Sequence, residues 1–167
     1  LAEALGGVGY SLAEEALLFA ELGAHATPGP FLATVLSARL AALAGAEELR
    51  DTILAGTSRV ALAEPHGDAT ATAGATVSGT FRVTDHGGAD LVLVLVGDAA
   101  SIVSASDLVA EPMASLDLLV PTAIGTVSGV TALAHIDDAA ALRLRATVLV
   151  AAELAGIATA TAEQSTQ

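Results

Sequence analysis

The last thirty residues constrain the fold of this chain more than any other stretch. Asp137 and Asp138 place acidic groups where a helix N-terminus favours them, and the pattern after them predicts one helix running to about Gln164. At 1.5 Å per residue this helix is roughly 40 Å long, so a domain as small as the rest of the chain cannot cover it. We therefore expect it to pack in a helical bundle that the chain does not supply. One face carries Leu142, Ala146, Leu149, Ala152 and Ala155 or Gly156.

The first third of the chain also carries helical patterns. Ser11 and Glu14 form a capping-box pattern, so a helix is expected to begin after Ser11. Gly23 is expected to end this helix, because glycine readily adopts the backbone conformation of a helix C-terminus. Two further helices are expected over residues 31–44 and 47–55, each followed by a glycine.

The periodicity then changes to that of short strands separated by glycines. Leu91–Val96 is fully apolar, as expected for a strand buried on both faces. Pro112 and Pro121 indicate loops or sheet edges. Strands of this length and spacing favour a small antiparallel barrel or sandwich. The other strand patterns cover residues 59–64, 70–78, 81–83, 101–106 and 132–136.

These patterns together predict an α+β chain of several domains. We expect an N-terminal helical domain over residues 1–57 and a small antiparallel β-barrel or sandwich over residues 58–136. Residues 137–167 are expected to be the first helix of a C-terminal helical bundle.

The composition excludes several classes of partner. With 19 acidic residues, six Arg and no Lys, the net charge is −13, so neither nucleic acid nor an anionic membrane would attract the chain. Apolar residues make up 53% and charged residues 15%, the reverse of a disordered acidic segment. The densest apolar run, Leu91–Val96, is far short of the roughly 20 residues of a membrane span. With no export signal, the cytoplasm is the expected location.

Motifs for metal-dependent, thiol or serine catalysis are absent. The chain has no cysteine, which excludes thiolate nucleophiles and cysteine-ligated metals. Residues 125–129 have the wrong spacing for a serine nucleophile elbow, and Gly6–Gly9 opens no βαβ unit of the kind that binds dinucleotides. The histidines do not show the i, i+3 or i, i+4 spacing of a helical metal site, since they are His25, His66, His86 and His135.

The order of several segments resembles the acyl-CoA dehydrogenases. A Gly-Gly-x-Gly loop leads to a helix that ends Glu-x-Gly, a proline turn follows, and a strand similar to the family's T-E-P strand comes next. A segment similar to T-N-G-x-x-A-D and its hydrophobic strand follow, and then a helix that resembles the opening helix of the family's C-terminal bundle. In the order described, these segments are residues 6–12, 20–23, 28–32, 61–65, 84–94 and 149–161.

The resemblance implies FAD-dependent α,β-desaturation of an acyl-CoA thioester. A carboxylate removes the α-proton while a hydride passes from the β-carbon to the flavin. In the family the T-E-P strand and a W-x-T segment contact the flavin ring, which implies flavin contacts at Thr84, Ala63 and Leu62. Ala63 replaces the Thr of T-E-P, and Arg82 stands where the Trp of W-x-T would be. The next stretch, residues 66–69, lacks the family's Ser.

The resemblance places the catalytic base outside this chain. In most relatives the base lies in the C-terminal bundle beyond residue 167, and in some it lies on the helix that opens the bundle. The corresponding turn here carries Arg143 and Arg145 instead of a carboxylate, and Glu153 is interpreted as a solvent or subunit-contact residue.

Three functions stay open on the sequence alone. The chain is either part of a catalytic acyl-CoA dehydrogenase subunit that binds FAD, or a non-catalytic structural subunit of a heteromeric acyl-CoA dehydrogenase. Both imply a homo- or hetero-oligomer, a dimer or tetramer, and the substitutions at Ala63 and Arg82 favour the second. The third is an unrelated binding or scaffold domain.

Overall fold

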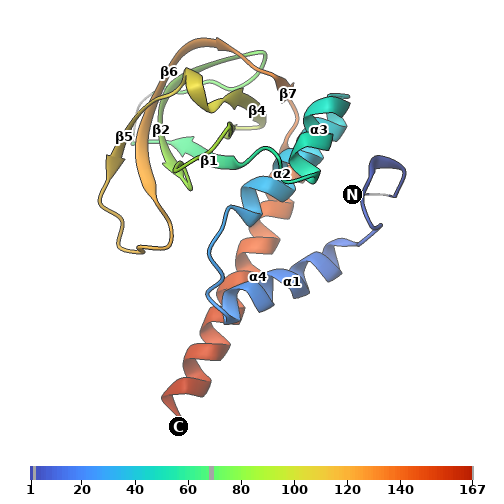
Figure 1. Ribbon diagram of the computed structural model, residues 1–167, viewed down its shortest axis with the longest axis vertical. Helices are drawn as coiled ribbons and strands as arrows, with labels where there is room; N and C mark the ends of the chain where they lie inside the picture. Colours follow the sequence, from blue (N-terminus) through green and yellow to red (C-terminus); the bar gives the residue numbers. More distant parts are fainter. Residues whose placement is uncertain (2, 68–69, 167) are drawn as a thin grey trace. The chain divides into compact units, whose positions relative to one another are not determined.

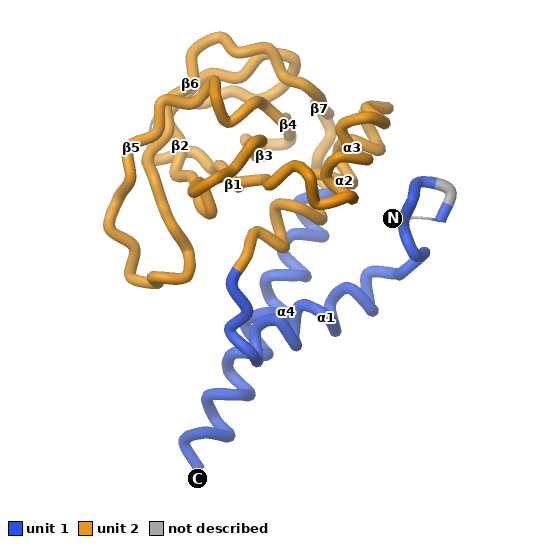
Figure 2. The backbone as a smooth tube through the Cα atoms, viewed as in Figure 1, with its two compact units in different colours: residues 1–28, 141–167 blue, residues 29–140 orange. Residues whose placement is uncertain are grey.

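The structure, a computed structural model, describes residues 1, 3–67 and 70–166. It forms two compact units: unit 1 contains residues 1–28 and 141–167, and unit 2 contains residues 29–140 (Figure 2). Asp68 and Ala69, in the stretch that lacks the family's Ser, lie outside the described residues. The domain boundaries predicted after residues 57 and 136 stay predictions.

The helices begin and end close to the predicted residues. The Ser11 side chain accepts a hydrogen bond from the Ala13 amide at 3.2 Å while the Glu14 carboxylate accepts one from the Ser11 amide, which confirms the capping box. At the last helix, the Asp138 carboxylate accepts a hydrogen bond from the Ala140 amide at 3.2 Å. The helices are η1 (Glu3–Leu5), α1 (Leu12–Ala24), α2 (Phe31–Leu43), α3 (Glu47–Leu54), η2 (Ala105–Asp107) and α4 (Ala140–Ser165).

Gly23 has a different role from the predicted helix stop. It lies within α1, which ends one residue later at Ala24. A side-chain carbon at Gly23 would collide with the main-chain carbonyl of Glu153 in α4, and one at Gly156 would collide with the carbonyl of Ala20 in α1. The two glycines therefore let the helices of unit 1 cross with their backbones in contact.

A buried ion pair also joins the two helices of unit 1. The Arg145 Nε atom lies 2.7 Å from Glu15 Oε2, and the two side chains are only 11% and 12% exposed. Arg145 is therefore a packing residue of the α1–α4 crossing.

Seven strands of unit 2 form one mixed, open sheet in the order β5-β6-β2-β1-β3-β4-β7 (Figure 1). Every neighbouring pair is antiparallel except β1 and β3, which run parallel, so the prediction of a purely antiparallel domain is wrong for this pair. Within the described residues β5 and β7 end the strand order, so a closed barrel or a sandwich is not confirmed. The strands are β1 (Val60–Pro65), β2 (Thr76–Thr84), β3 (Leu91–Val96), β4 (Ala99–Ser104), β5 (Val109–Met113), β6 (Thr122–Thr131) and β7 (Ala134–Ile136).

The hairpin of β5 and β6 is absent from the sequence prediction. Pro112 lies in the edge strand β5, opposite Ala123 of β6, which confirms its interpretation as a sheet-edge residue. All five residues of β5 are exposed, and the buried positions of β6 include small residues such as Ala123 and Gly125. Neither strand therefore shows a clear alternation of large apolar and polar residues.

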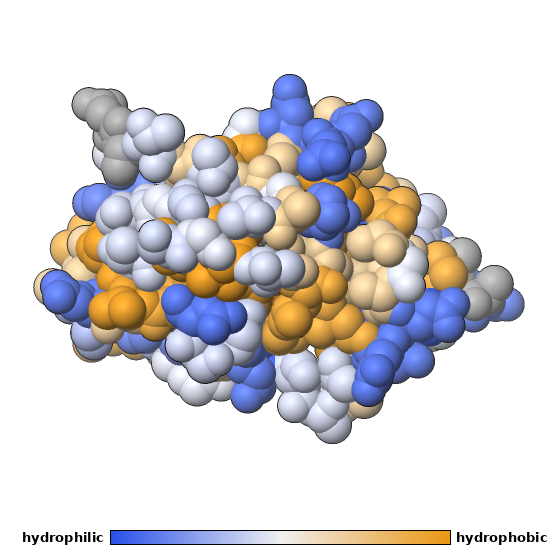
Figure 3. Space-filling view, turned by 90° about the horizontal axis from the view of Figure 1, so that it is seen from above, coloured by the Kyte–Doolittle hydropathy of each residue, from blue (hydrophilic) through white to orange (hydrophobic). Residues whose placement is uncertain are grey.

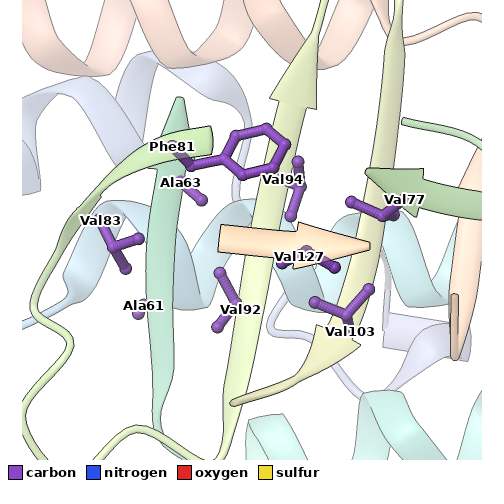
Figure 4. Close-up of a cluster of buried hydrophobic side chains, with 9 residues drawn as sticks. All are labelled: Ala61, Ala63, Val77, Phe81, Val83, Val92, Val94, Val103 and Val127. Carbon is purple, nitrogen blue, oxygen red and sulfur yellow. The ribbon is translucent and has the colours of Figure 1, made fainter. Parts of the chain in front are cut away.

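Each face of the sheet packs against a different set of residues. One face encloses an apolar cluster whose side chains point toward one another (Figure 4). On the other face, α2 contacts β1, β3, β4 and β7 and contributes the fully buried Leu36 and Leu40. Strand β3 is buried from Leu91 to Leu95, as its apolar sequence predicts. The cluster is formed by Ala61, Ala63, Val77, Phe81, Val83, Val92, Val94, Val103 and Val127.

Candidate functional site

Two of the predicted flavin contacts, Leu62 and Thr84, are directly opposite each other on β1 and β2. Opposed residues of an antiparallel pair share one face, and both side chains are half-buried. The Thr84 hydroxyl donates a hydrogen bond of 3.5 Å to the Leu62 carbonyl, well beyond the usual length for a hydroxyl donor. This surface, the Leu62–Thr84 wall, therefore offers a weakly engaged hydroxyl next to an aliphatic side chain.

Ala63, the third predicted contact, lies on the opposite face. It is paired with Val83, is fully buried and belongs to the apolar cluster around Phe81. Its side chain therefore cannot touch a ligand on the Leu62–Thr84 wall, although its main chain could. Alanine suits this interior position because a hydroxyl would need a buried hydrogen-bond partner.

Arg82 and Glu64 form the next opposed pair on the same face as the wall. The Arg82 Nη2 atom lies 3.3 Å from Glu64 Oε2, with side chains 55% and 49% exposed. An ion pair this exposed contributes little to folding stability because water screens it. Arg82, which the resemblance aligns with the family's Trp, thus places a guanidinium group beside the wall.

The same face continues across β6 and β5. Thr84 is opposed by Thr122 and Arg82 by Ile124, while Met113 and Glu111 follow on β5. Hydroxyl donors, aliphatic side chains and one ion pair form a surface suited to a planar ring with a polar edge. The wall therefore fits part of what a flavin ring needs, and the strand residues described on this face include no aromatic side chain.

Asp85 is a feature of the site that the sequence reasoning missed. It follows Thr84 and adopts a left-handed backbone with φ of 57°. Burial raises the pKa of the Asp85 carboxyl, against the opposing electrostatic effect of Arg59 and His86. Its position in the segment similar to T-N-G-x-x-A-D was an available signal, because Asn and Asp are the non-glycine residues that best tolerate this backbone.

The raised pKa predicts how Asp85 changes stability with pH. Below about pH 3 the carboxyl is mostly protonated in both the folded and the unfolded chain. As pH rises, the unfolded chain ionises first, so the free energy of unfolding falls until the pH passes the raised pKa of the folded state. We expect Asp85→Asn to have a higher melting temperature than wild type at pH 7 and nearly the same one at pH 3.

Asp85→Ala is the matched control for this measurement. It removes the same charge, but alanine is strained at a φ of 57° and should recover less stability. A wild-type chain more stable than Asp85→Asn at pH 7 would show that burial does not dominate at this carboxyl.

Other kinds of site receive no support from the described part of the chain. No group of three His, Asp or Glu side chains there could hold a metal ion. No helix in it is both long enough and apolar enough to cross a membrane. A surface pocket beside α3 shares no residue with the Leu62–Thr84 wall and is lined by Ala46, Glu47, Glu48, Leu49, Thr52 and Leu133.

The sequence matches no protein-family model and no curated protein, whereas solved structures share its fold. The ChsE4–ChsE5 complex from Mycobacterium tuberculosis matches with a TM-score of 0.75 and 22% identity, over 95% of this chain and 50% of that one. Butyryl-CoA dehydrogenase from Megasphaera elsdenii matches with a TM-score of 0.68 and 16% identity, over 96% and 54% of the two chains. The resemblance to acyl-CoA dehydrogenases is confirmed for the fold.

A third structure, of PigA with FAD and proline, matches with a TM-score of 0.71 and 16% identity, over 98% of this chain and 54% of that one. The chain thus spans about half the length of the acyl-CoA dehydrogenase-like structures that it matches. Both units take part in the likeness, because the matches cover nearly all of this chain.

Proposed function

We propose that this chain is part of an acyl-CoA dehydrogenase-type flavoprotein subunit that uses FAD to desaturate an acyl-CoA thioester. The observation that carries the proposal is the Leu62–Thr84 wall, where two of the three predicted flavin contacts meet as one half-buried pair in a chain of this fold. The likeness to butyryl-CoA dehydrogenase supports the substrate class, and the likeness to PigA with FAD supports the cofactor.

The residues of the wall have distinct roles in this proposal. Bound FAD would supply the hydride acceptor for the desaturation. Thr84 would donate a hydrogen bond to the polar edge of the ring, and Leu62 would keep water from its face. Glu64, whose carboxylate pairs with Arg82, is not proposed as the base. The base is proposed to come from outside this chain, as the resemblance implies.

A second function, a non-catalytic structural subunit of a heteromeric dehydrogenase, is favoured by two substitutions. The guanidinium of Arg82 replaces an aromatic plane, and Ala63 provides no hydroxyl and faces the interior. The likeness to the ChsE4–ChsE5 complex supports an assembly of this kind. In that case the Leu62–Thr84 wall would complete a site whose remaining contacts come from a partner.

Either function is proposed to require an oligomer. Val150, Leu154 and Ile157 recur at intervals of three and four residues along α4 and are exposed, which is the spacing of a stripe that packs against another helix. On the face drawn in Figure 3, hydrophobic (orange) residues lie among hydrophilic (blue) ones. Further large apolar side chains are exposed in β5 and the β5–β6 turn, namely Val109, Met113, Leu116, Leu118 and Leu119.

The visible absorption spectrum separates the two functions. Flavin bands in the chain purified alone would support the catalytic subunit, and bands that appear only after co-expression with products of adjacent genes would support the structural subunit. Absence of flavin from both preparations, together with no binding of an acyl-CoA, would contradict both.

Thr84→Val tests the wall directly. Valine keeps the shape of threonine but removes the hydroxyl, so we expect FAD affinity to fall about threefold to tenfold. The measurement is a titration of FAD by fluorescence quenching in whichever preparation binds flavin.

Thr126→Val is the matched control, because Thr126 is an exposed threonine on the same face, two rows from Thr84. Its FAD affinity should equal that of wild type. Equal losses in the two variants, or no loss in Thr84→Val, would remove Thr84 from the flavin site.

A further inference from the structure

Arg82 is placed beside the Leu62–Thr84 wall by strand geometry. It precedes Thr84 by two residues on β2, so both side chains lie on one face of the sheet. Its opposed neighbours are Glu64 on β1 and Ile124 on β6. A ligand that lies along the wall therefore reaches Arg82 next after Thr84.

The contact with Glu64 restrains Arg82 while leaving most of its binding groups available. One hydrogen bond, from Nη2 to Glu64 Oε2 at 3.3 Å, is the only one that the guanidinium makes within the described residues. A guanidinium has five N–H donors and a planar face. About half of the side chain is exposed, so a ligand can reach part of it.

We propose that Arg82 is a positioning residue that stacks its guanidinium plane on the flavin ring, a role that rests on the proposed function. A guanidinium is planar and weakly hydrated, and it stacks on aromatic surfaces. The described strand residues of this face include no aromatic side chain, and the chain has no Trp. Arg82 thus supplies a planar group that the strands of this face otherwise lack, and Glu64 lies beside it as an ion-pair partner.

The positive charge gives this arrangement a further consequence. A cation beside the ring favours the flavin state that carries more negative charge, which is the reduced state. We therefore expect the flavin reduction potential to be higher in the wild-type protein than in Arg82→Trp. An indole at this position would supply the plane without the charge.

Three substitutions of Arg82 separate the contribution of its planar group to FAD binding from that of its positive charge. Arg82→Ala removes both and is expected to weaken FAD binding about fivefold, and Arg82→Lys keeps only the charge and is expected to weaken it about threefold. Arg82→Trp keeps only the plane and is expected to bind FAD within about twofold of wild type. The readouts are the dissociation constant by fluorescence titration of FAD and the reduction potential by dye-coupled spectrophotometry, in the preparation that binds flavin.

The outcomes distinguish this inference from the proposed function. If wild type binds no FAD in any preparation, both are overturned. If wild type binds FAD but Arg82→Ala binds it equally well, Arg82 is only a surface ion-pair partner and the inference alone is overturned. If Arg82→Lys equals wild type while Arg82→Trp is as weak as Arg82→Ala, charge and not stacking holds the ligand, which also overturns it. Because the ion pair is half exposed, all three variants should melt within a few degrees of wild type.

Discussion

Gly156→Ala is expected to destabilise unit 1 by about 2–3 kcal/mol, even though alanine is the better helix former. In an exposed helix the same change would stabilise by about 1 kcal/mol. Here the new Cβ would lie 2.8 Å from the Ala20 carbonyl carbon and 2.9 Å from the Ala24 amide nitrogen, and closer still to the Ala20 oxygen. Main-chain atoms cannot rotate away as a flexible side chain can, so α1 and α4 would have to move apart.

Hydrogen exchange of the full chain measures this effect where it should occur. Amides of α1 and α4 should exchange faster in Gly156→Ala, while those of β3 in unit 2 keep their wild-type rates. Gly23→Ala should behave in the same way, because its Cβ would meet the Glu153 carbonyl. The urea midpoint should fall together with the protection of the two helices.

Gly87→Ala is the control for the effect of glycine replacement itself. Its backbone φ is ordinary, and an added Cβ at Gly87 meets no atom within 4 Å. We expect no loss of stability, or a small gain from the reduced freedom of the unfolded chain. If Gly156→Ala were as stable as Gly87→Ala, the backbone contact between α1 and α4 would not exist in solution.

The sequence predicts best those features whose causes lie within a few neighbouring residues. Ser11 and Glu14 are three positions apart and cap each other, so the start of α1 could be located. Leu91–Val96 is apolar throughout, and it forms a strand in the middle of the sheet. In both cases a short stretch contains the physical reason for its own structure.

Features that depend on distant residues could not be predicted in the same way. Gly23 has the local pattern of a helix stop, but the carbonyl that explains it belongs to Glu153 of another helix. The parallel pairing of β1 with β3 joins strands about thirty residues apart, and no local pattern encodes its direction. Strand β6 was missed because small residues at its buried positions hide the alternation.

The candidate site could be predicted only in part, because it also depends on residues that are distant in the sequence. The resemblance indicated Leu62 and Thr84, and the register of β1 and β2 makes them a pair. The side to which Ala63 points depends on that register, so only the structure places it in the interior. Thr122 and Ile124 join the same face through β6, a strand that the sequence reasoning did not include.

Removing either partner of the Glu15–Arg145 ion pair is expected to cost about 3–5 kcal/mol, because each change leaves a buried charge without its partner. The two side chains are only 12% and 11% exposed, and the Nε–Oε2 distance is 2.7 Å. Glu15→Leu and Arg145→Met should each lower the urea midpoint strongly. The double variant should recover most of the loss, because it removes both charges and restores apolar packing.

A double-mutant cycle on the full chain gives the coupling energy of the pair, expected to be at least as large as the loss in either single variant, because the double variant recovers most of that loss. The half-exposed pair of Arg82 and Glu64 provides the control, since Glu64→Leu should cost less than about 1 kcal/mol. The contrast between the two pairs depends on burial and not on residue type, because both join an Arg to a Glu. If Glu15→Leu costs no more than Glu64→Leu, water reaches the Glu15–Arg145 pair, and the glycine contacts alone hold α1 against α4.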